Sequence, residues 1–381
     1  MSAAVIGATA FGLPSKPDSG VWLKGGGEKP RPFAMHCPMN FTSDNAYGAA
    51  EEIVKALADA NAGTAAPYGE DEFTTRLTYR VGDIFEREVA VFPVVTGTAA
   101  NALSLATVSP PYGAIFCHAE SHIAVDECGA PEFFSGGAKL VHLEGTDGKI
   151  TPGAVESALA HYRGGVHSPK PSAISITQAT ERGTVYRPAE IRALSEVAQR
   201  EGMALHMDGA RFANALAHLN CGAADITWKA GVDVLSFGAS KNGALCAEAI
   251  VSFDPALVRD VEYRRKRAGH LLSKMRFVSA QLEAYLAEDR WLKWAALANA
   301  KAQRLADVLK SVPAVQLAHP VEANEIFVFM PNALAQKIRG AGAQFYDWSA
   351  SANEQTLARF VLSFLTPEQD IESLSAILRQ Q

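Results

Sequence analysis

Short apolar runs alternate with helical segments between about residues 89 and 237, and this alternation constrains the fold more than any other feature. The pairs are "VAVFPVV" with "TAANALSLATV", "AIFCH" with "HIAVDECGAPEFF", "KLVHLEG" with "TPGAVESALAHY", and "AISIT" with "PAEIRALSEVAQREG", followed by "ALHMD" and "VDVLSF". Such alternation is typical of β-α units and predicts an α/β fold whose mostly parallel sheet is covered by helices on both faces. Functional residues of such sheets follow the carboxyl ends of the strands.

The rest of the 381-residue chain differs in pattern, which suggests three parts. Residues 1–40 hold clusters of Gly and Pro, and we expect a flexible N-terminal extension there. Residues 41–258 form the large α/β domain. Residues 259–381 begin with long helical stretches and continue with two strand-like runs, "EIFVFM" and "RFVLSF". We therefore expect long helices and a smaller C-terminal α+β domain in this last part.

Composition restricts the partners and the compartment. The net charge is −6, with 48% apolar and 20% charged residues, so neither nucleic acid nor an anionic membrane is expected as the main partner. The five cysteines form no C-x-x-C motif, which is typical of thiols in a reducing cytoplasm. No apolar run approaches the roughly 18 residues of a spanning helix, and no secretory signal is evident. We expect a cytoplasmic protein.

Two strand ends carry residues with chemical potential. "VVTGTAAN" places Gly97, Thr98 and Ala99 between a strand and a helix, where backbone N–H groups and the helix dipole can hold a phosphate. The same residues also suit an ordinary strand-helix turn with an N-cap threonine. "LHMDGARF" places Asp208 directly after an apolar strand. A buried carboxylate needs a partner, so Asp208 could pair with Arg211, cap a helix or bind a ligand.

Two further strand ends carry a lysine and two histidines. Lys241 lies among small residues in "SFGASKNG", where it could be a solvated loop residue or a reactive amine. His118 and His122 follow another strand in "CHAESHIAVDE", and either could be a hydrogen-bonded core histidine. The spacing of Cys117, His118, His122 and Cys128 does not fit a zinc site, so no metal is expected.

Together, these strand-end residues meet the needs of pyridoxal phosphate (PLP). That cofactor requires a phosphate cradle, a flat ring to stack on, an acid for its ring nitrogen and an amine that binds it covalently. The chain offers them in the order phosphate turn, histidine, aspartate, lysine. We therefore predict PLP as the cofactor.

The sequence also resembles the low-specificity L-threonine aldolases, a family within the β-eliminating lyases of PLP fold type I. The resemblance runs from residue 41 to the C-terminus. It rests on "FTSDN", "PYGEDE", "TGTAAN", "SHIAVDECGAPEFFS", "SITQATERGTVY", "HMDGARFANAL", "WKAGVDVLSFGASKNG", "YRRKRAGHLLSKMRF" and "RFVLSF". It implies a PLP-dependent transferase-like fold and aldol cleavage of L-threonine, L-allo-threonine and other L-β-hydroxy-α-amino acids to glycine and an aldehyde.

The resemblance assigns roles around the cofactor. Lys241 would bind PLP covalently, Asp208 would keep its ring nitrogen protonated, and His122 would stack on the ring. The phosphate would contact the backbone and hydroxyl groups of the turn residues Gly97, Thr98 and Ala99. We thus expect Lys241, His122 and Asp208 to be the catalytic residues.

The resemblance also assigns the substrate-binding residues. Arg359 and Ser43 match positions that hold the amino acid carboxylate, and Arg211 matches a second arginine near that group and the cofactor. This grip would select the Cα–Cβ bond for cleavage. Many relatives carry a second histidine in an "ENTHNG"-like turn, whereas this chain has Thr180 and Glu181 there. His122, or a water that it holds, is therefore the expected proton acceptor.

A basic run at residues 264–267 permits three interpretations. It could bind nucleic acid or form a solvated helix face. The resemblance implies instead that Lys266 or Arg267, together with Arg276, reaches the cofactor phosphate or active site of a neighbouring subunit. Tyr68 in "PYGEDE" matches a further tyrosine near that site. Shared sites predict a homo-oligomer, either a dimer or a tetramer.

Two alternative functions remain open at this point. The first is another PLP-dependent β-eliminating lyase, or an aminotransferase, that acts on a small amino acid. The second is an inert protein of the same fold that binds a partner or senses the cofactor. The presence of Lys241, Asp208, Arg211 and Arg359 argues against the inert protein, because each of these residues has a chemical role in the enzymes.

Overall fold

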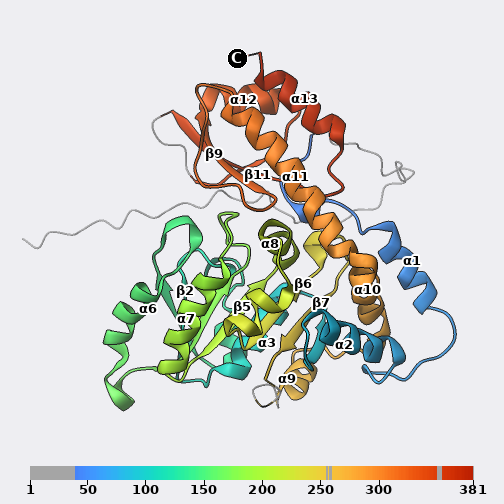
Figure 1. Cartoon of the computed structure of the whole chain (residues 1–381), viewed down its shortest axis with the longest axis vertical. Coiled ribbons are helices and arrows are strands. Elements are labelled where there is room, and N and C mark those ends of the chain that lie inside the picture. Colours follow the sequence, from blue (N-terminus) through green and yellow to red (C-terminus); the bar gives the residue numbers. More distant parts are fainter. Residues whose placement is uncertain (1–38, 255, 257–259, 350–353, 381) are drawn as a thin grey trace, which may run out of the picture. The chain divides into compact units, whose positions relative to one another are not determined.

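The computed structural model describes residues 39–254, 256, 260–349 and 354–380 of the chain. The flexible extension that we predicted for residues 1–40 lies outside the described residues, except for Met39 and Asn40. These two begin the part of the chain that Figure 1 draws in colour.

A seven-stranded sheet forms the centre of the fold, with the strand order β1-β7-β6-β5-β4-β2-β3. Strands β2 to β6 pair in parallel, whereas β7 is antiparallel to both of its neighbours, β1 and β6. The predicted mostly parallel sheet is thereby confirmed. The strands are β1 (Ala90–Val94), β2 (Gly113–His118), β3 (Lys139–Leu143), β4 (Lys170–Thr177), β5 (Ala204–Gly209), β6 (Val234–Gly238) and β7 (Glu248–Ser252).

Helices cover both faces of this sheet (Figure 1). Successive side chains of a strand point to opposite faces, so the apolar residues of one strand pack against helices on both sides. On one side, Ile115 and Cys117 belong to a cluster with α3 (Gly97–Val108). On the other, Phe116 belongs to the main core, which includes residues of four helices that follow or precede the strands. These helices are α6 (Pro152–Leu159), α7 (Pro188–Arg200), α8 (Phe212–Leu219) and α10 (Arg276–Leu286).

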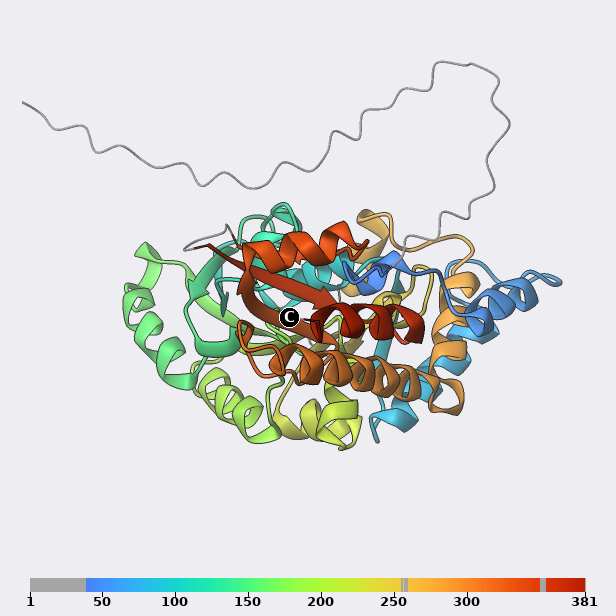
Figure 2. The same cartoon turned by 90° about the horizontal axis from the view of Figure 1, so that it is seen from above.

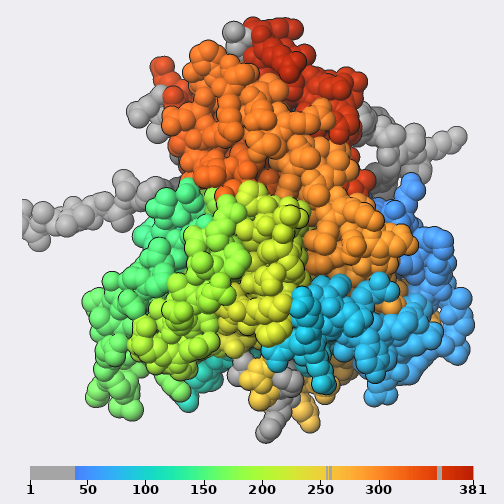
Figure 3. Space-filling view, viewed as in Figure 1, coloured from blue at the N-terminus to red at the C-terminus, as the bar shows by residue number. Residues whose placement is uncertain are grey.

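Two helices precede the first strand, α1 (Glu51–Ala60) and α2 (Glu72–Ile84). The side chain of Asp71 caps α2 by accepting a hydrogen bond from Thr74 N. Arg76 of α2 bonds to Glu283 of α10, and the space-filling view shows the two helices against each other (Figure 3).

A second, antiparallel sheet lies in the C-terminal part, with the order β10-β11-β9-β8. Helices α11, α12 and α13 pack beside these strands and share a hydrophobic core with them (Figure 2). Met39 and Phe41 belong to the same core, so the first described residues pack against the last part of the chain. The elements are α11 (Arg290–Lys310), β8 (Gln316–Leu317), β9 (Glu325–Pro331), α12 (Asn332–Gly340), β10 (Tyr346–Asp347), β11 (Gln355–Val361) and α13 (Glu368–Leu378).

Candidate active site

A cavity of about 320 Å³ lies at the carboxyl ends of the central strands. Residues that follow β1, β2, β4, β5 and β6 line it, as expected for a parallel sheet. Six of the predicted site residues are among them: Gly97, Thr98, His122, Asp208, Arg211 and Lys241. The structure therefore brings these six together from four separate segments of the chain.

The turn after β1 begins helix α3 at the cavity wall. Thr96 is the N-cap, and its Oγ1 accepts a hydrogen bond from Ala99 N at 3.1 Å. That bond engages the N–H of Ala99, which does not line the cavity. Above Gly97 the space is open, since a Cβ atom there would meet no atom within 4 Å. The helix dipole and this open space suit a phosphate group.

Asp208 is a buried carboxylate near the carboxyl end of strand β5, one residue before its last residue, Gly209. Its Oδ1 accepts from Ala210 N at 2.9 Å and its Oδ2 accepts from Asn101 Nδ2 at 2.8 Å. The possible structural pair with Arg211 is not formed, and no ion pair to Asp208 is found among the described residues. A buried anion with only neutral donors is costly, so a protonated ring nitrogen in the cavity would complete this site.

His122 is tied to Asp208 by a chain of hydrogen bonds. It begins helix α4 (His122–Val125), and its Nδ1 lies 2.8 Å from Oε1 of the buried Glu127. Asn101 Nδ2 donates to that same oxygen and to Asp208. Burial lowers the pKa of His122, but the hydrogen bond to Glu127 and the charge of Asp208 outweigh it and raise the pKa overall.

Lys241 lies in the turn after β6, between two anchored neighbours. On one side, Ala239 N and Ser240 N donate to the carboxylate of Glu248 on β7. On the other, Asn242 Nδ2 donates to Tyr285 Oη and to the backbone oxygen of Trp291. Glu248 also lines the cavity, and burial raises its pKa to about 7. The turn is therefore fixed on both sides of the amine.

Arg211 is already paired within the protein. Its Nε lies 2.8 Å from Asp44 Oδ2, and its Nη1 lies 3.1 Å from Glu325 Oε2. All three side chains are buried. Burial lowers the pKa of Arg211, but the two carboxylates outweigh it and raise the pKa above its ordinary value. Its predicted contact with the substrate carboxylate would thus be made beside two anions.

Two other predicted substrate residues lie near this group without lining the cavity. Ser43 accepts a hydrogen bond from Asn45 N, and Asn45 lines the cavity. Arg359 of β11 donates to the backbone oxygen of Thr42 at 3.3 Å and lies 4.7 Å from the ring centre of Trp348. Its Nε is buried and has no hydrogen-bond partner among the described residues.

The residues predicted to reach a neighbouring subunit lie outside the cavity of their own chain. Tyr68 is 47% exposed, and Lys266 Nζ lies 4.7 Å from its ring centre. Arg276 begins α10, and its guanidinium lies over the ring of Phe277. The basic run at residues 264–267 is not uniformly solvated, since Arg265 is buried.

Three polar residues of this site were not predicted from the sequence. Asn101 was part of the quoted turn "TGTAAN", but its link between two carboxylates depends on the tertiary structure. Glu127 follows His122 by five residues, in a segment without regular periodicity. Glu248 could have been found from the sequence, because it is the one charged residue within β7. Glu181, which stands where many relatives carry a second histidine, also lines the cavity.

Searches for two other kinds of site gave negative results within the described ranges. No group of three or more His, Cys, Asp or Glu residues could hold a metal ion in that part of the chain. None of the helices described is both long and apolar enough to span a membrane.

Comparison with known proteins identifies the class to which this fold and this cavity belong. The sequence profile of the family described as "Beta-eliminating lyase" matches residues 40–333. The chain belongs to this family, so the resemblance that the sequence motifs indicated is confirmed. The family and the fold imply PLP, and the buried Asp208 and the open turn at Gly97 fit that cofactor.

Particular relatives support the same assignment. The low specificity L-threonine aldolase of a Pseudomonas species is 43% identical over 339 residues, which cover 89% of this chain and 96% of the relative. The solved structure of a Leishmania major threonine aldolase has a TM-score of 0.85 at 26% identity and covers 90% of this chain and 99% of its own. The Oryza sativa TDC structure with PLP, with a TM-score of 0.70 at 13% identity, covers 90% of this chain and 82% of its own and shares the fold alone.

Proposed function

We propose that this protein is a PLP-dependent carbon–carbon lyase, a threonine aldolase. It cleaves L-threonine, L-allo-threonine and other L-β-hydroxy-α-amino acids to glycine and an aldehyde. The observation that carries the proposal is the cavity at the strand ends, which joins Lys241, Asp208 and His122 to the N-terminus of α3. The 43% identity to a named aldolase over nearly the whole chain supports the choice of reaction.

The chain's own residues would hold the cofactor in this cavity. Lys241 supplies the amine for covalent attachment, and Asp208 accepts the hydrogen bond of the protonated ring nitrogen. His122 would stack on the ring, while Gly97 and Thr98 would bind the phosphate at the helix N-terminus. When bound, PLP acts as an electron sink that stabilises negative charge at Cα of an amino acid.

The carboxylate grip would decide which bond breaks. Arg359 has an unpartnered buried N–H, and Arg211 lines the cavity. Arginine suits this task because its planar fork binds a carboxylate through two hydrogen bonds. With the carboxylate held there, together with Ser43, the Cα–Cβ bond is the one aligned for cleavage. A proton must then leave the β-hydroxyl as the aldehyde forms.

The assembly belongs to the proposal as well. Tyr68 and Arg276 would complete the site of a neighbouring subunit, with Lys266 or Arg267, in a homodimer or homotetramer. Tyr68 is half exposed in the single chain, as expected of a residue that a partner covers. The cysteine pattern of the sequence favours a cytoplasmic location.

Product analysis tests this function. Purified protein loaded with PLP should convert L-threonine to glycine and acetaldehyde in equal amounts, measured by chromatography and a coupled aldehyde assay. A β-eliminating lyase or an aminotransferase would instead yield a keto acid, with release of ammonia or transfer of the amino group. Formation of a keto acid without glycine would contradict the proposal and support that alternative.

A further inference from the structure

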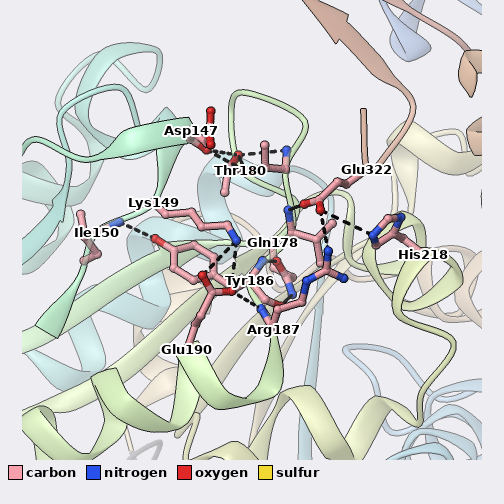
Figure 4. Close-up of polar contacts among 12 residues, drawn as sticks. Asp147, Lys149, Ile150, Gln178, Thr180, Tyr186, Arg187, Glu190, His218 and Glu322 are labelled. Carbon is pink, nitrogen blue, oxygen red and sulfur yellow. Dashed lines mark hydrogen bonds and ion pairs between the residues drawn. The ribbon is translucent and has the colours of Figure 1, made fainter. Parts of the chain in front are cut away.

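The loop between β4 and α7 holds Glu181 at the cavity wall. Figure 4 shows how the residues on either side are bonded. Gln178 exchanges two hydrogen bonds with the backbone of Tyr186, and Thr180 bonds to Thr184 and to the backbone oxygen of Asp147. These bonds fix the backbone around Glu181 in one position.

The tip of the loop is held on two further sides. Arg182 forms an ion pair with Glu120, which follows β2. Val185 N donates to Glu322, a residue that also binds Arg187 (Figure 4). A rigid loop of this kind can position a side chain accurately in a site.

Despite this bracing, the carboxylate of Glu181 has no hydrogen bond and no ion pair with any described residue. Four ionisable groups act on it electrostatically: Lys241, Asp208, Glu325 and His122. Lys241, Asp208 and His122 line the cavity with it. Burial raises the pKa of Glu181, which makes its anion a stronger base than an ordinary glutamate. An unpartnered carboxylate at this place is available to a ligand.

His122, the proton acceptor expected from the sequence, is less free. Its Nδ1 bonds to Glu127 at 2.8 Å, and its Nε2 lies 3.6 Å from Asp126. Its raised pKa also favours the protonated ring, which cannot accept a proton. Stacking on a cofactor ring would occupy its face. From the sequence, His122 was expected both to stack on the cofactor ring and to accept the proton of the β-hydroxyl. Its contacts in the structure suit the first task better than the second.

We infer that Glu181 is the catalytic residue that takes the proton from the β-hydroxyl of the substrate. The O–H bond breaks and its proton moves to the Glu181 carboxylate. The electron pair left on oxygen forms the carbonyl bond of the aldehyde, and the pair of the Cα–Cβ bond remains on Cα of the glycine fragment. This inference rests on the proposed aldol cleavage and names the group that accepts the proton of the β-hydroxyl.

Glu181→Gln tests the inference, because it removes the base and keeps the size of the side chain. Its kcat/KM for L-threonine should fall about 10²- to 10⁴-fold, the usual contribution of general base catalysis. Exchange of the α-hydrogens of glycine with deuterated solvent needs no β-hydroxyl proton. That exchange, followed by NMR, should stay within about threefold of the wild type.

Binding and pH dependence give readouts that a structural defect would not reproduce. L-2-Aminobutyrate lacks the β-hydroxyl, so its dissociation constant should be the same in the wild type and in Glu181→Gln. Wild-type cleavage should decline as the pH falls through the raised pKa of Glu181, and the variant should lack this decline. Glu181→Asp should regain part of the activity. Glu156→Gln, which removes an exposed carboxylate of α6 outside the cavity, should cleave threonine within about threefold of the wild type.

The outcomes separate this inference from the proposed function. If the wild type releases no acetaldehyde, the proposed function is wrong and the role of Glu181 falls with it. If the wild type cleaves threonine and Glu181→Gln does so at a similar rate, only the inference about Glu181 is wrong. Loss of glycine exchange in both Glu181 variants would also overturn it, since the residue would then act on the whole cavity.

Discussion

Asn101 joins two carboxylates through a single amide nitrogen, and this defines the site at the scale of the residue. One hydrogen of its Nδ2 is donated to Asp208 and the other to Glu127. Glu127 in turn binds Nδ1 of His122, so Asp208 and His122 are joined through shared hydrogen-bond partners. A change at Glu127 is therefore expected to act on the protonation of His122.

Glu127→Gln should lower the pKa of His122, because an amide replaces the charged acceptor. We expect this decrease in the pKa of His122 to be visible in the pH titration of its imidazole resonances, measured by NMR. In the wild type, the raised pKa means that His122 stabilises the folded state below its unfolded pKa of about 6.5, and this contribution is lost as the pH rises through the folded pKa. The pH dependence of unfolding between these values should shrink in the variant.

Asp126→Asn provides the matched control. Asp126 lies 3.6 Å from Nε2 of His122, but its side chain is 73% exposed, so solvent screens its charge. The pKa of His122 should change little in this variant. An equal shift in both variants would contradict the role given to Glu127.

At the scale of the element, the ends of the strands explain why some of the site residues could be predicted from the sequence. Asp208 and Lys241 could be assigned because each follows an apolar run, and the carboxyl ends of parallel strands meet at one edge. The reversed direction of β7 could not be read in the same way. An apolar strand has the same composition in either direction, and only its pairing with β1 and β6 defines its orientation.

Thr96→Ala is expected to weaken both the fold and the binding of PLP, because Thr96 caps α3 beside the cavity. Loss of an N-cap hydrogen bond costs about 1 kcal/mol of the free energy of unfolding. The dissociation constant of PLP, measured by dialysis and absorbance, should rise with it.

Thr151→Ala is a control of the same chemistry. Thr151 caps α6 through Ala154 N and does not line the cavity. Its loss should cost a similar free energy of unfolding and leave PLP affinity unchanged. If both variants weakened PLP binding equally, α3 would have no special part in holding the phosphate.

At the scale of the whole molecule, a buried ion group joins segments from distant parts of the sequence. Arg211 after β5 binds Asp44 near the start of the described chain and Glu325 at the start of β9. Asn324 donates to Asp44 as well. The sequence analysis identified Arg211 but not these partners, since the pairing requires the N-terminal segment and the C-terminal sheet to meet. The pattern of residues within one segment does not predict a contact between segments so far apart in the sequence.

Asp44→Asn should destabilise the protein by about 3 to 5 kcal/mol, because it leaves part of a buried positive charge uncompensated. Urea unfolding measures this loss. Burial raises the pKa of Asp44, but Arg211 and Lys241 outweigh it, so the pKa in the folded state is lowered. Its stabilising contribution is thus present above the unfolded pKa of about 3.9 and is lost as the pH falls through the lower folded value.

Asp59→Asn removes an acid of the same type from an exposed ion pair with Lys55. The expected change in the free energy of unfolding is at most about 0.5 kcal/mol. Equal stability of the two variants would show that the buried group does not hold these segments together.

The proposed function depends on covalent attachment of the cofactor to Lys241, which peptide mapping can detect. The purified protein is loaded with PLP, reduced with borohydride to fix any bond between cofactor and amine, digested and analysed by mass spectrometry. We expect one modified peptide, with the added mass of the reduced cofactor on Lys241. Modification of a different lysine, or none at all in protein that cleaves threonine, would contradict it.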